Sequence, residues 1–122
     1  MTPSPDIKFH FDPFASGLEK FAGPLEAEIL AIIWDNGPIA AKRVQYFLNL
    51  RKKYAYTTVS TVLTHLVQKG FLNRQKKSHS FLFHPVLSRE QFLKSAIDKV
   101  LSGLIDSFPA VTNEILKSYK KK

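Results

Sequence analysis

The sequence predicts a mainly α-helical protein with one small β-hairpin. Three stretches with helical periodicity come first, at about residues 24–36, 40–50 and 57–69, and two strand-like runs follow them. The helical period then returns from Ser88 to about Ser118. Three helices followed by a hairpin with a cationic tip are the element order of a winged helix-turn-helix, here continued by C-terminal helices.

The totals fit one compact domain with an appended dimerising segment, because the chain has 122 residues of which 44% are apolar. The absence of cysteine excludes a disulfide framework and any cysteine-ligated metal site. The N-terminus lacks the pattern of a signal peptide, and no apolar run approaches the roughly 18 residues that a membrane span needs. We therefore expect a soluble, cytoplasmic protein with no membrane partner.

The chain is expected to have three parts: an N-terminal arm at residues 1–22, a winged-helix domain at 23–87 and a helical dimerisation segment at 88–122. The arm holds four phenylalanines but no sustained helical period. It is expected either to dock on the body or on a partner, or to fray as chain termini often do.

The first helix opens at Gly23-Pro24, because a proline in the first turn lacks only an N–H that would be unpaired anyway. Asn36-Gly37-Pro38 ends it. Its expected inward stripe consists of Leu25, Ile29, Ile32 and Ile33. The second helix is expected from Ala40 to Leu50, and its expected buried residues are Val44, Phe47 and Leu48.

The third helix is expected to have Thr57 as its N-cap and Gly70 as a left-handed terminator. Its apolar face consists of Val59, Val62, Leu63, Leu66 and Val67. Its opposite face carries Thr58, Ser60, Thr61, Thr64, His65 and Gln68. Solvent-facing helix positions usually favour Glu, Lys or Gln, so this hydroxyl-rich face favours recognition over a plain surface.

A hairpin follows, with strands expected at residues 71–75 and 80–86 and a basic, exposed connection of Lys76, Lys77, Ser78 and His79. In the second strand, Phe81 and Phe83 are expected on one face. Leu82 and His84 are expected on the other, as in a hairpin that packs on helices.

The middle of the chain is purely cationic. No Asp or Glu occurs between Asn36 and Arg89, although the overall charge is only +8. The ten cations of this window are Lys42, Arg43, Arg51, Lys52, Lys53, Lys69, Arg74, Lys76, Lys77 and Arg89. Removing carboxylates as well as adding cations favours a polyanionic partner such as nucleic acid. The alternative is a solvated basic face that has no partner.

The last part begins with Ser88 and Gln91 at capping-box spacing. A wide apolar stripe follows, and a further helix from about Pro109 to Ser118 covers part of it. The rest is expected to pair with a second copy, through Leu93, Ile97, Val100, Leu101, Leu104, Ile105 and Phe108. The alternative is that the long helix folds back on its own domain.

Nothing in the inventory predicts an enzyme. The four histidines show no metal-ligand spacing, and there is no cysteine nucleophile, paired carboxylate in the cationic window or glycine-rich phosphate loop. We expect no catalytic residue, no metal and no cofactor. The competing class is a winged helix that binds protein or RNA without operator specificity.

Three stretches of the sequence carry a resemblance. They are residues 23–29 with Trp34, residues 56–72, and Phe83-His84-Pro85 with residues 88–93. Together they resemble the penicillinase-repressor family of bacterial transcription factors over roughly residues 23–108. The resemblance implies a homodimeric winged-helix repressor on a palindromic operator in double-stranded DNA. It implies a third helix in the major groove, a wing on the backbone and dimerising C-terminal helices.

Residue roles follow from this resemblance and from the charges. The expected base-reading residues are Thr57, Thr58, Ser60, Thr61, Thr64 and His65. The expected backbone contacts are Arg43, Lys52, Lys53, Lys76, Lys77 and His79. His65 stands where the family commonly has arginine, so we expect a weaker or pH-dependent contact there.

Three departures from the family pattern are expected to matter. The wing turn has Ser78-His79 in place of the usual glycine, and the C-terminal segment is a helix shorter, so a smaller dimer interface is expected. The copper-responsive branch uses a cysteine-rich tail, which this sequence lacks. Some relatives are inactivated by proteolysis when a membrane sensor detects β-lactam, and no residue here identifies such a sensor.

Overall fold

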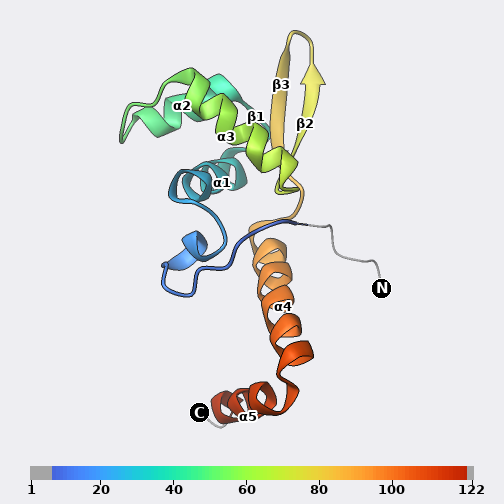
Figure 1. Cartoon of the computed structure of the whole chain (residues 1–122). Coiled ribbons are helices and arrows are strands. Elements are labelled where there is room, and N and C mark those ends of the chain that lie inside the picture. Colours follow the sequence, from blue (N-terminus) through green and yellow to red (C-terminus); the bar gives the residue numbers. More distant parts are fainter. Residues whose placement is uncertain (1–6, 121–122) are drawn as a thin grey trace. The chain divides into compact units, whose positions relative to one another are not determined.

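A computed structural model of the chain describes residues 7–120 (Figure 1). Residues 1–6 of the expected arm and residues 121–122 lie outside the described residues. In order, the elements are η1 (Gly17–Lys20), α1 (Pro24–Asn36), β1 (Ile39–Ala40), α2 (Ala41–Asn49), α3 (Tyr56–Gln68), β2 (Leu72–Lys77), β3 (Ser80–Pro85), α4 (Arg89–Ser107) and α5 (Pro109–Lys120). The chain divides into two compact units, the first ending at Arg89 and the second beginning at Glu90.

The first unit has the predicted winged helix-turn-helix architecture: α1, α2 and α3 are followed by the hairpin β2–β3, which stands beside α3 in Figure 1. The fold class is therefore confirmed. The sheet has one more strand than expected, because β1 pairs antiparallel with β3 in the order β1-β3-β2. Ile39 lies opposite Phe83. A two-residue strand is too short to give an alternating pattern, so only the packing of distant segments reveals it.

The core of this unit is made by one face of each helix. The buried residues of α1 are Ala27, Ile29, Leu30 and Ile33, those of α2 are Ala41, Val44 and Leu48, and those of α3 are Val59, Leu63 and Leu66. The expected stripe of α1 was partly wrong, since Leu25 and Ile32 are half-buried while Leu30 is fully buried. α1 has more apolar residues than one face can hold, and the packing of α2 and α3 decides which of them are buried.

The ends of α1 and α3 follow local chemistry. α1 ends at Asn36 with Gly37 as its C-cap, and glycine fits there because a Cβ on Gly37 would lie 2.6 Å from the Ile33 carbonyl oxygen. Gly70 has φ +82°, as expected for a left-handed terminator.

The expected N-cap of α3 was wrong, because α3 begins at Tyr56 with Ala55 as its N-cap. The preceding loop is held by α2 instead. Gln45 Nε2 donates to the Tyr54 carbonyl oxygen at 3.0 Å, and the Tyr54 N–H donates to Asn49 Oδ1 at 2.8 Å. The helix therefore starts without a side-chain cap, and Thr57 lies inside its first turn.

The hairpin is longer than expected. Lys76 and Lys77 belong to β2 rather than to the connection, and Lys77 pairs with Ser80 across a two-residue turn of Ser78 and His79. Ser78 has φ +59°, the left-handed conformation that glycine usually supplies in such turns. The tip is therefore a tight turn that carries serine in a position suited to glycine.

The second unit consists of the two predicted helices, with Pro109 in the first position of α5. The turn between them is tied by hydrogen bonds. The Phe108 N–H donates to the Leu104 carbonyl oxygen at 2.7 Å, and Thr112 Oγ1 donates to the same oxygen at 3.2 Å. None of the helices described here is long and apolar enough to cross a membrane.

Candidate nucleic-acid interface

The hydroxyl-rich face of α3 is displayed by a helix whose other face is firmly anchored. Val59, Leu63 and Leu66 are completely buried. On the opposite side, the exposed residues are Thr57, Thr58, Thr61, His65 and Gln68. An α-helix turns about 100° per residue, which places Thr61 almost diametrically opposite the buried stripe. Thr61 therefore occupies the centre of the exposed face.

Two of the expected base-reading residues lie at the edge of this face. Ser60 and Thr64 are half-buried, and Thr64 Oγ1 donates to the Ser60 carbonyl oxygen at 3.0 Å. The Thr64 hydroxyl proton is therefore used within the helix.

Ser60 and Thr64 also line a hollow of about 590 Å³ between α3, the start of α2 and the hairpin. Its other lining residues include Lys42, Tyr56, Arg74, His79 and Phe81. The expected base-reading set is thus divided between an open face and a cationic recess beside the wing.

Several of the exposed cations make cation–π contacts with aromatic rings at the surface. The Arg43 guanidinium lies 5.0 Å from the ring centroid of Tyr46 and 5.1 Å from that of Phe47, and Lys52 Nζ lies 5.6 Å from that of Tyr54. Such cation–π contacts limit side-chain motion while leaving the charge accessible. The side chains of Arg43 and Lys52 are therefore both exposed and restricted in their motion.

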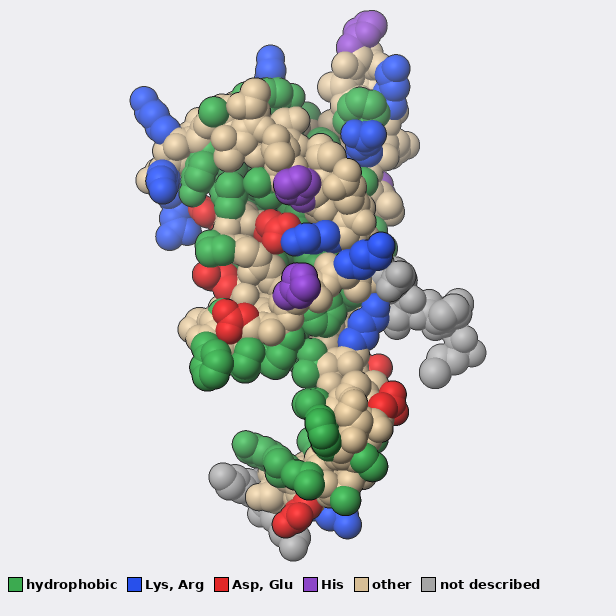
Figure 2. Space-filling view, in the orientation of Figure 1, with side chains coloured by type: hydrophobic (Ala, Val, Ile, Leu, Met, Phe, Trp, Pro, Cys, Tyr) green, Lys and Arg blue, Asp and Glu red, His purple; other side chains and the backbone are tan. Residues whose placement is uncertain are grey.

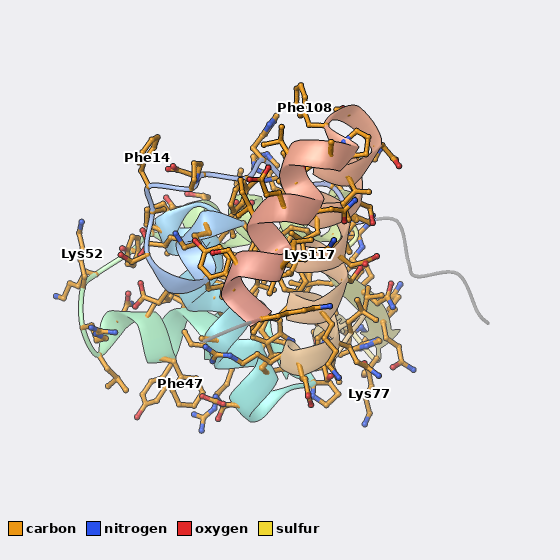
Figure 3. All side chains as sticks on the ribbon, turned by 90° about the horizontal axis from the view of Figure 1, so that it is seen from below. Phe14, Phe47, Lys52, Lys77, Phe108 and Lys117 are labelled. Atoms are coloured by element: carbon orange, nitrogen blue, oxygen red, sulfur yellow. The ribbon has the colours of Figure 1, made fainter. Side chains whose placement is uncertain are left out.

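The remaining expected backbone contacts are also exposed: Lys53 in the α2–α3 loop, Lys76 and Lys77 on β2, and His79 in the turn. Figure 3 shows Lys52 and Lys77 projecting on opposite sides of the first unit. The cations therefore bracket α3 from the loop side and from the wing side, as phosphate contacts on two sides of a groove would require.

Three further residues of the candidate interface were given no role from the sequence, although Lys42 and Arg74 belong to the cationic window. Lys42 and Tyr56 line the recess beside the wing, and the Arg74 guanidinium lies 4.9 Å from the ring centroid of Phe81. Arg74 and Phe81 lie on neighbouring strands, where Phe81 is paired with Lys76. The two-residue period of β2 puts Arg74 and Lys76 on one face, a signal that the sequence contained.

The acid-free stretch of sequence becomes one side of the first unit. It supplies α2, α3 and the hairpin, whereas the acidic residues before it belong to α1 and the segment that precedes α1. Figure 2 shows Lys and Arg around the α2, α3 and hairpin end of the first unit, and Asp and Glu nearer α1, where some Lys and Arg also lie. Two cations of the acid-free stretch contact glutamates of α1, Lys69 with Glu26 and Arg51 with Glu28, and the charge separation along the sequence is therefore only partly kept in space.

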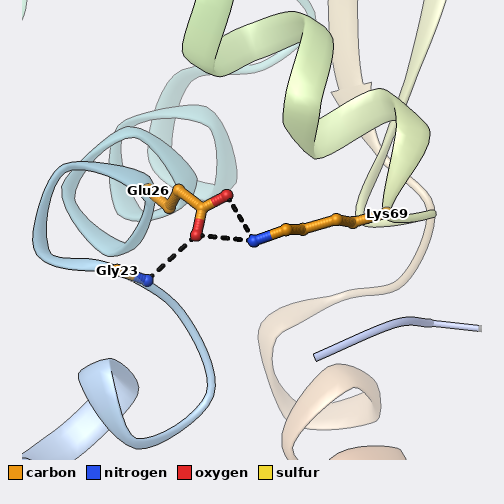
Figure 4. Close-up of polar contacts among 3 residues, drawn as sticks. All are labelled: Gly23, Glu26 and Lys69. Carbon is orange, nitrogen blue, oxygen red and sulfur yellow. Dashed lines mark hydrogen bonds and ion pairs between the residues drawn. The ribbon is translucent and has the colours of Figure 1, made fainter. Parts of the chain in front are cut away.

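Lys69 is a cation of this window that forms an ion pair within the fold. Its Nζ lies 2.8 Å from Glu26 Oε2 and 3.0 Å from Glu26 Oε1, and Oε1 also accepts a hydrogen bond from the Gly23 N–H at 3.0 Å (Figure 4). This contact joins the first turn of α1 to the end of α3.

The same contacts change the acidity of Glu26. Burial acts to raise the pKa of its carboxyl group, but the hydrogen bonds from Lys69 and Gly23 and the charges of Lys69 and His65 outweigh burial. The pKa of Glu26 is therefore below its ordinary value.

The expected dimerisation residues lie on α4, except Phe108, which lies between α4 and α5. Ile97, Leu104 and Phe108 are exposed, Phe108 by 61%, while Leu93, Val100, Leu101 and Ile105 are half-buried. A hollow of about 440 Å³ with almost purely apolar walls runs between α4 and α5. It is lined by Leu101, Leu104, Phe108, Val111, Thr112, Ile115, Leu116 and Tyr119. Tyr119 was not foreseen from the sequence.

No metal centre competes with this interpretation in the described part of the chain. Across residues 7–120, no group of three or more His, Cys, Asp or Glu side chains is placed to hold a metal ion.

Comparison with known proteins gives consistent results. Over 86 residues the chain is 24% identical to the penicillinase repressor of Bacillus licheniformis, a match that covers 67% of each chain. Over 86 residues it is 27% identical to the methicillin resistance regulatory protein MecI of Staphylococcus aureus (strain N315), covering 67% of this chain and 70% of the relative.

A solved structure is also similar: the solution structure of the Bacillus licheniformis BlaI monomeric form in complex with the blaP half-operator. The identity is 25% and the TM-score 0.48, and the match covers 65% of this chain and 88% of that chain. The model of the penicillinase repressor family matches residues 22–121, which is most of the sequence. With the winged helix already described, this match assigns the chain: it belongs to the penicillinase repressor family.

Proposed function

We propose that this protein is a sequence-specific DNA-binding transcriptional repressor that acts as a homodimer on a palindromic operator. The observation that carries the proposal is the open hydroxyl face of α3, with exposed cations in the loop before α3 and on the hairpin after it, in a stretch of sequence that has no acidic residue. The relatives named above, a penicillinase repressor and a regulatory protein, support the same activity.

Affinity would come from the cations. Arg43, Lys52 and Lys53, from α2 and the loop after it, and Lys76 and Lys77, from the hairpin, are exposed and would contact phosphates. Each phosphate contact releases counterions, so the logarithm of the binding constant falls with the logarithm of salt concentration by about 0.9 per contact. We therefore expect strongly salt-dependent binding.

Sequence choice would come from α3. A major groove admits one α-helix, and threonine hydroxyls can donate to or accept from base edges while their methyl groups contact thymine. Thr57 and Thr61 are the best placed for this role, with His65 and Gln68 further along the same exposed face. Such a face suits an A·T-containing half-site.

Two copies would fix the geometry of the operator. The apolar hollow between α4 and α5, together with exposed Phe108, gives the second unit a surface suited to an identical surface on a second copy. A twofold dimer would place its two α3 helices about 34–36 Å apart, one turn of B-DNA, or a multiple of that distance.

The test is a titration of the purified protein with labelled duplexes from the DNA upstream of its own gene. We expect saturable binding to a short palindrome and weaker binding to a scrambled duplex of equal length, with affinity falling steeply as salt rises. Lys76→Ala with Lys77→Ala should weaken both complexes and lower the salt slope by about 1 per lysine in each protomer.

The same titration distinguishes the repressor from a winged helix that binds protein or RNA without operator specificity. Equal affinity for the palindrome, the scrambled duplex and a single-stranded RNA of equal length would show a general nucleic-acid binder and refute operator recognition. Binding to none of the three would indicate a protein-interaction module.

A further inference from the structure

The segment before α1 is folded onto itself through a network of hydrogen bonds. The Asp12 N–H donates to the Lys20 carbonyl oxygen at 2.8 Å, which closes a loop around η1. Lys20 Nζ then donates to the carbonyl oxygens of Pro13 at 2.8 Å and Ala15 at 2.7 Å. The loop is therefore fastened across its own middle, and Phe14 at its tip points outward with 95% exposure (Figure 3).

Aromatic contacts attach the rest of this segment to that loop. The Phe9 ring packs edge-on against Phe21, with centroids 5.4 Å apart, and Phe11 stacks on Phe21 at 5.7 Å. Phe21 itself is 6% exposed. Two of the arm's phenylalanines thus converge on a third that is part of the core, which gives the extended stretch before Asp12 a fixed path.

That path ends at the recognition helix. The Lys8 N–H donates to the Lys69 carbonyl oxygen at 2.9 Å, and Ile7 beside it is only 3% exposed. Lys69 is the C-cap of α3: its own N–H donates to the His65 carbonyl oxygen at 2.9 Å, and its Nζ binds Glu26. The carbonyl oxygens at the end of a helix have no partner within it, so the arm satisfies one of them.

We propose that residues 7–22 are a positioning element of the recognition helix, which fixes the C-terminal turn of α3 in the orientation in which it meets DNA. The proposal rests on the proposed function. The family match begins at residue 22, so all of this element except its last residue lies before the matched region. It acts through the Lys8 N–H on the Lys69 carbonyl oxygen, with buried Ile7 anchoring the segment beside Lys8, and neither residue needs to touch DNA.

The consequence is local. On the exposed face of α3, Gln68 directly precedes Lys69, whose carbonyl oxygen accepts from Lys8, and His65 lies one turn earlier. A terminal turn that opens readily would spread these side chains over several orientations, and the cost of ordering them would reduce operator affinity. Contacts made by the wing and by Arg43 would be unchanged.

The experiment compares Lys8→Pro with Lys8→Ala in the full chain. Proline removes the N–H that donates to Lys69, whereas alanine removes only an exposed side chain and keeps that N–H. Hydrogen exchange at the amides of residues 69–71 should accelerate about threefold to tenfold in Lys8→Pro, the range for one lost hydrogen bond, and should not change in Lys8→Ala. Operator affinity should fall by a similar factor in Lys8→Pro alone.

The salt slope separates positioning from direct contact. A lost phosphate contact lowers the slope, whereas a positioning element leaves it unchanged, so Lys8→Pro should bind the operator more weakly at a native slope. Ile7→Ala and its exposed control Phe14→Ala form an independent pair. Only Ile7→Ala should accelerate exchange at residues 69–71 and weaken operator binding at a native slope.

Two results would overturn the proposal: native exchange at residues 69–71 in both Lys8→Pro and Ile7→Ala, or faster exchange there with native operator affinity. Failure of the proposed function is recognised separately, because the unmodified chain would then bind palindrome and scrambled duplex equally well.

Discussion

Thr61 and Thr64 are identical side chains that lie in different environments on the same helix. Thr61 faces solvent at the centre of the exposed side of α3. Thr64 lies at its edge, half-buried, with its hydroxyl proton already donated to the Ser60 carbonyl oxygen. A hydroxyl committed to its own backbone can only accept a further hydrogen bond, so base recognition should depend mainly on Thr61.

Replacement of each threonine by valine tests this difference, because valine keeps the shape and differs little in helix propensity. Thr61→Val should weaken palindrome binding by about 1 kcal/mol per protomer while leaving binding to scrambled DNA unchanged. Thr64→Val should have a smaller effect on both. Fluorescence anisotropy with the two duplexes measures it, and a larger loss for Thr64→Val would contradict this division of roles.

Glu26 stabilises the fold, and its lowered pKa gives the pH range in which it does so. A carboxyl group whose pKa is lower in the folded than in the unfolded state stabilises the fold above its ordinary pKa of 4.5. That stabilisation is lost as the pH falls below 4.5 and through the folded-state pKa. Exposure of Lys69 keeps its size modest.

Glu26→Gln should therefore lower the free energy of unfolding by about 1 kcal/mol at pH 7, and its deficit relative to the native chain should shrink as the pH falls below about 4. Glu28→Gln is the matched control on the same helix, since Glu28 makes only a 4.0 Å contact with exposed Arg51. Urea unfolding across this pH range measures both. A pH-independent deficit for Glu26→Gln would mean that packing, and not charge, is responsible.

At the scale of elements, the wing combines a well-paired ladder with a strained turn. All six residues of β2 are paired with β3, and Arg74 packs on Phe81 across the strands. The turn, however, forces Ser78 to φ +59°. A left-handed conformation costs an L-residue roughly 1–2 kcal/mol, whereas glycine adopts it freely.

Ser78→Gly should therefore stabilise the protein by about 0.5 kcal/mol, after the extra flexibility of glycine in the unfolded chain is deducted. The comparison variant is Ser80→Gly, two residues on and inside β3, which should destabilise by a similar amount because strand glycines do so. Denaturant titration gives both signs. Equal destabilisation by the two variants would refute the assignment of strain to Ser78.

At the scale of the whole molecule, the two units divide the proposed work. The first carries the acid-free face, and the second carries the apolar surface between α4 and α5, which is rich in exposed side chains such as Phe108 and Ile115. Figure 2 shows hydrophobic side chains along these two helices. Linking two DNA-binding units through such a surface raises operator affinity without any new DNA contact.

Phe108→Glu should therefore give a monomer in sedimentation velocity and reduce affinity for the full palindrome by about 100-fold or more, with little change for a half-site duplex. Asn113→Glu introduces the same charge at an exposed polar position of α5 and should leave the dimer intact. A Phe108→Glu chain that remains dimeric would remove this surface from the interface.

The sequence alone determined the order of the five helices and the hairpin, the hydroxyl face of α3 and the purely cationic window. These are periodic or compositional properties, and they survive in any packing that buries the apolar stripe of α3. The family resemblance was confirmed for the same reason, since it rests on short runs such as residues 56–72 whose order is local.

Only the tertiary structure decided which residues meet across long separations. β1 exists because β3 comes alongside it, and α3 starts at Tyr56, with the loop before it held by side chains of α2. The contact of Lys8 with Lys69 is of the same kind. Hydrogen bonds between distant segments produce no periodic pattern in the sequence. Each donor could pair with many acceptors until the packing of the core fixes their positions.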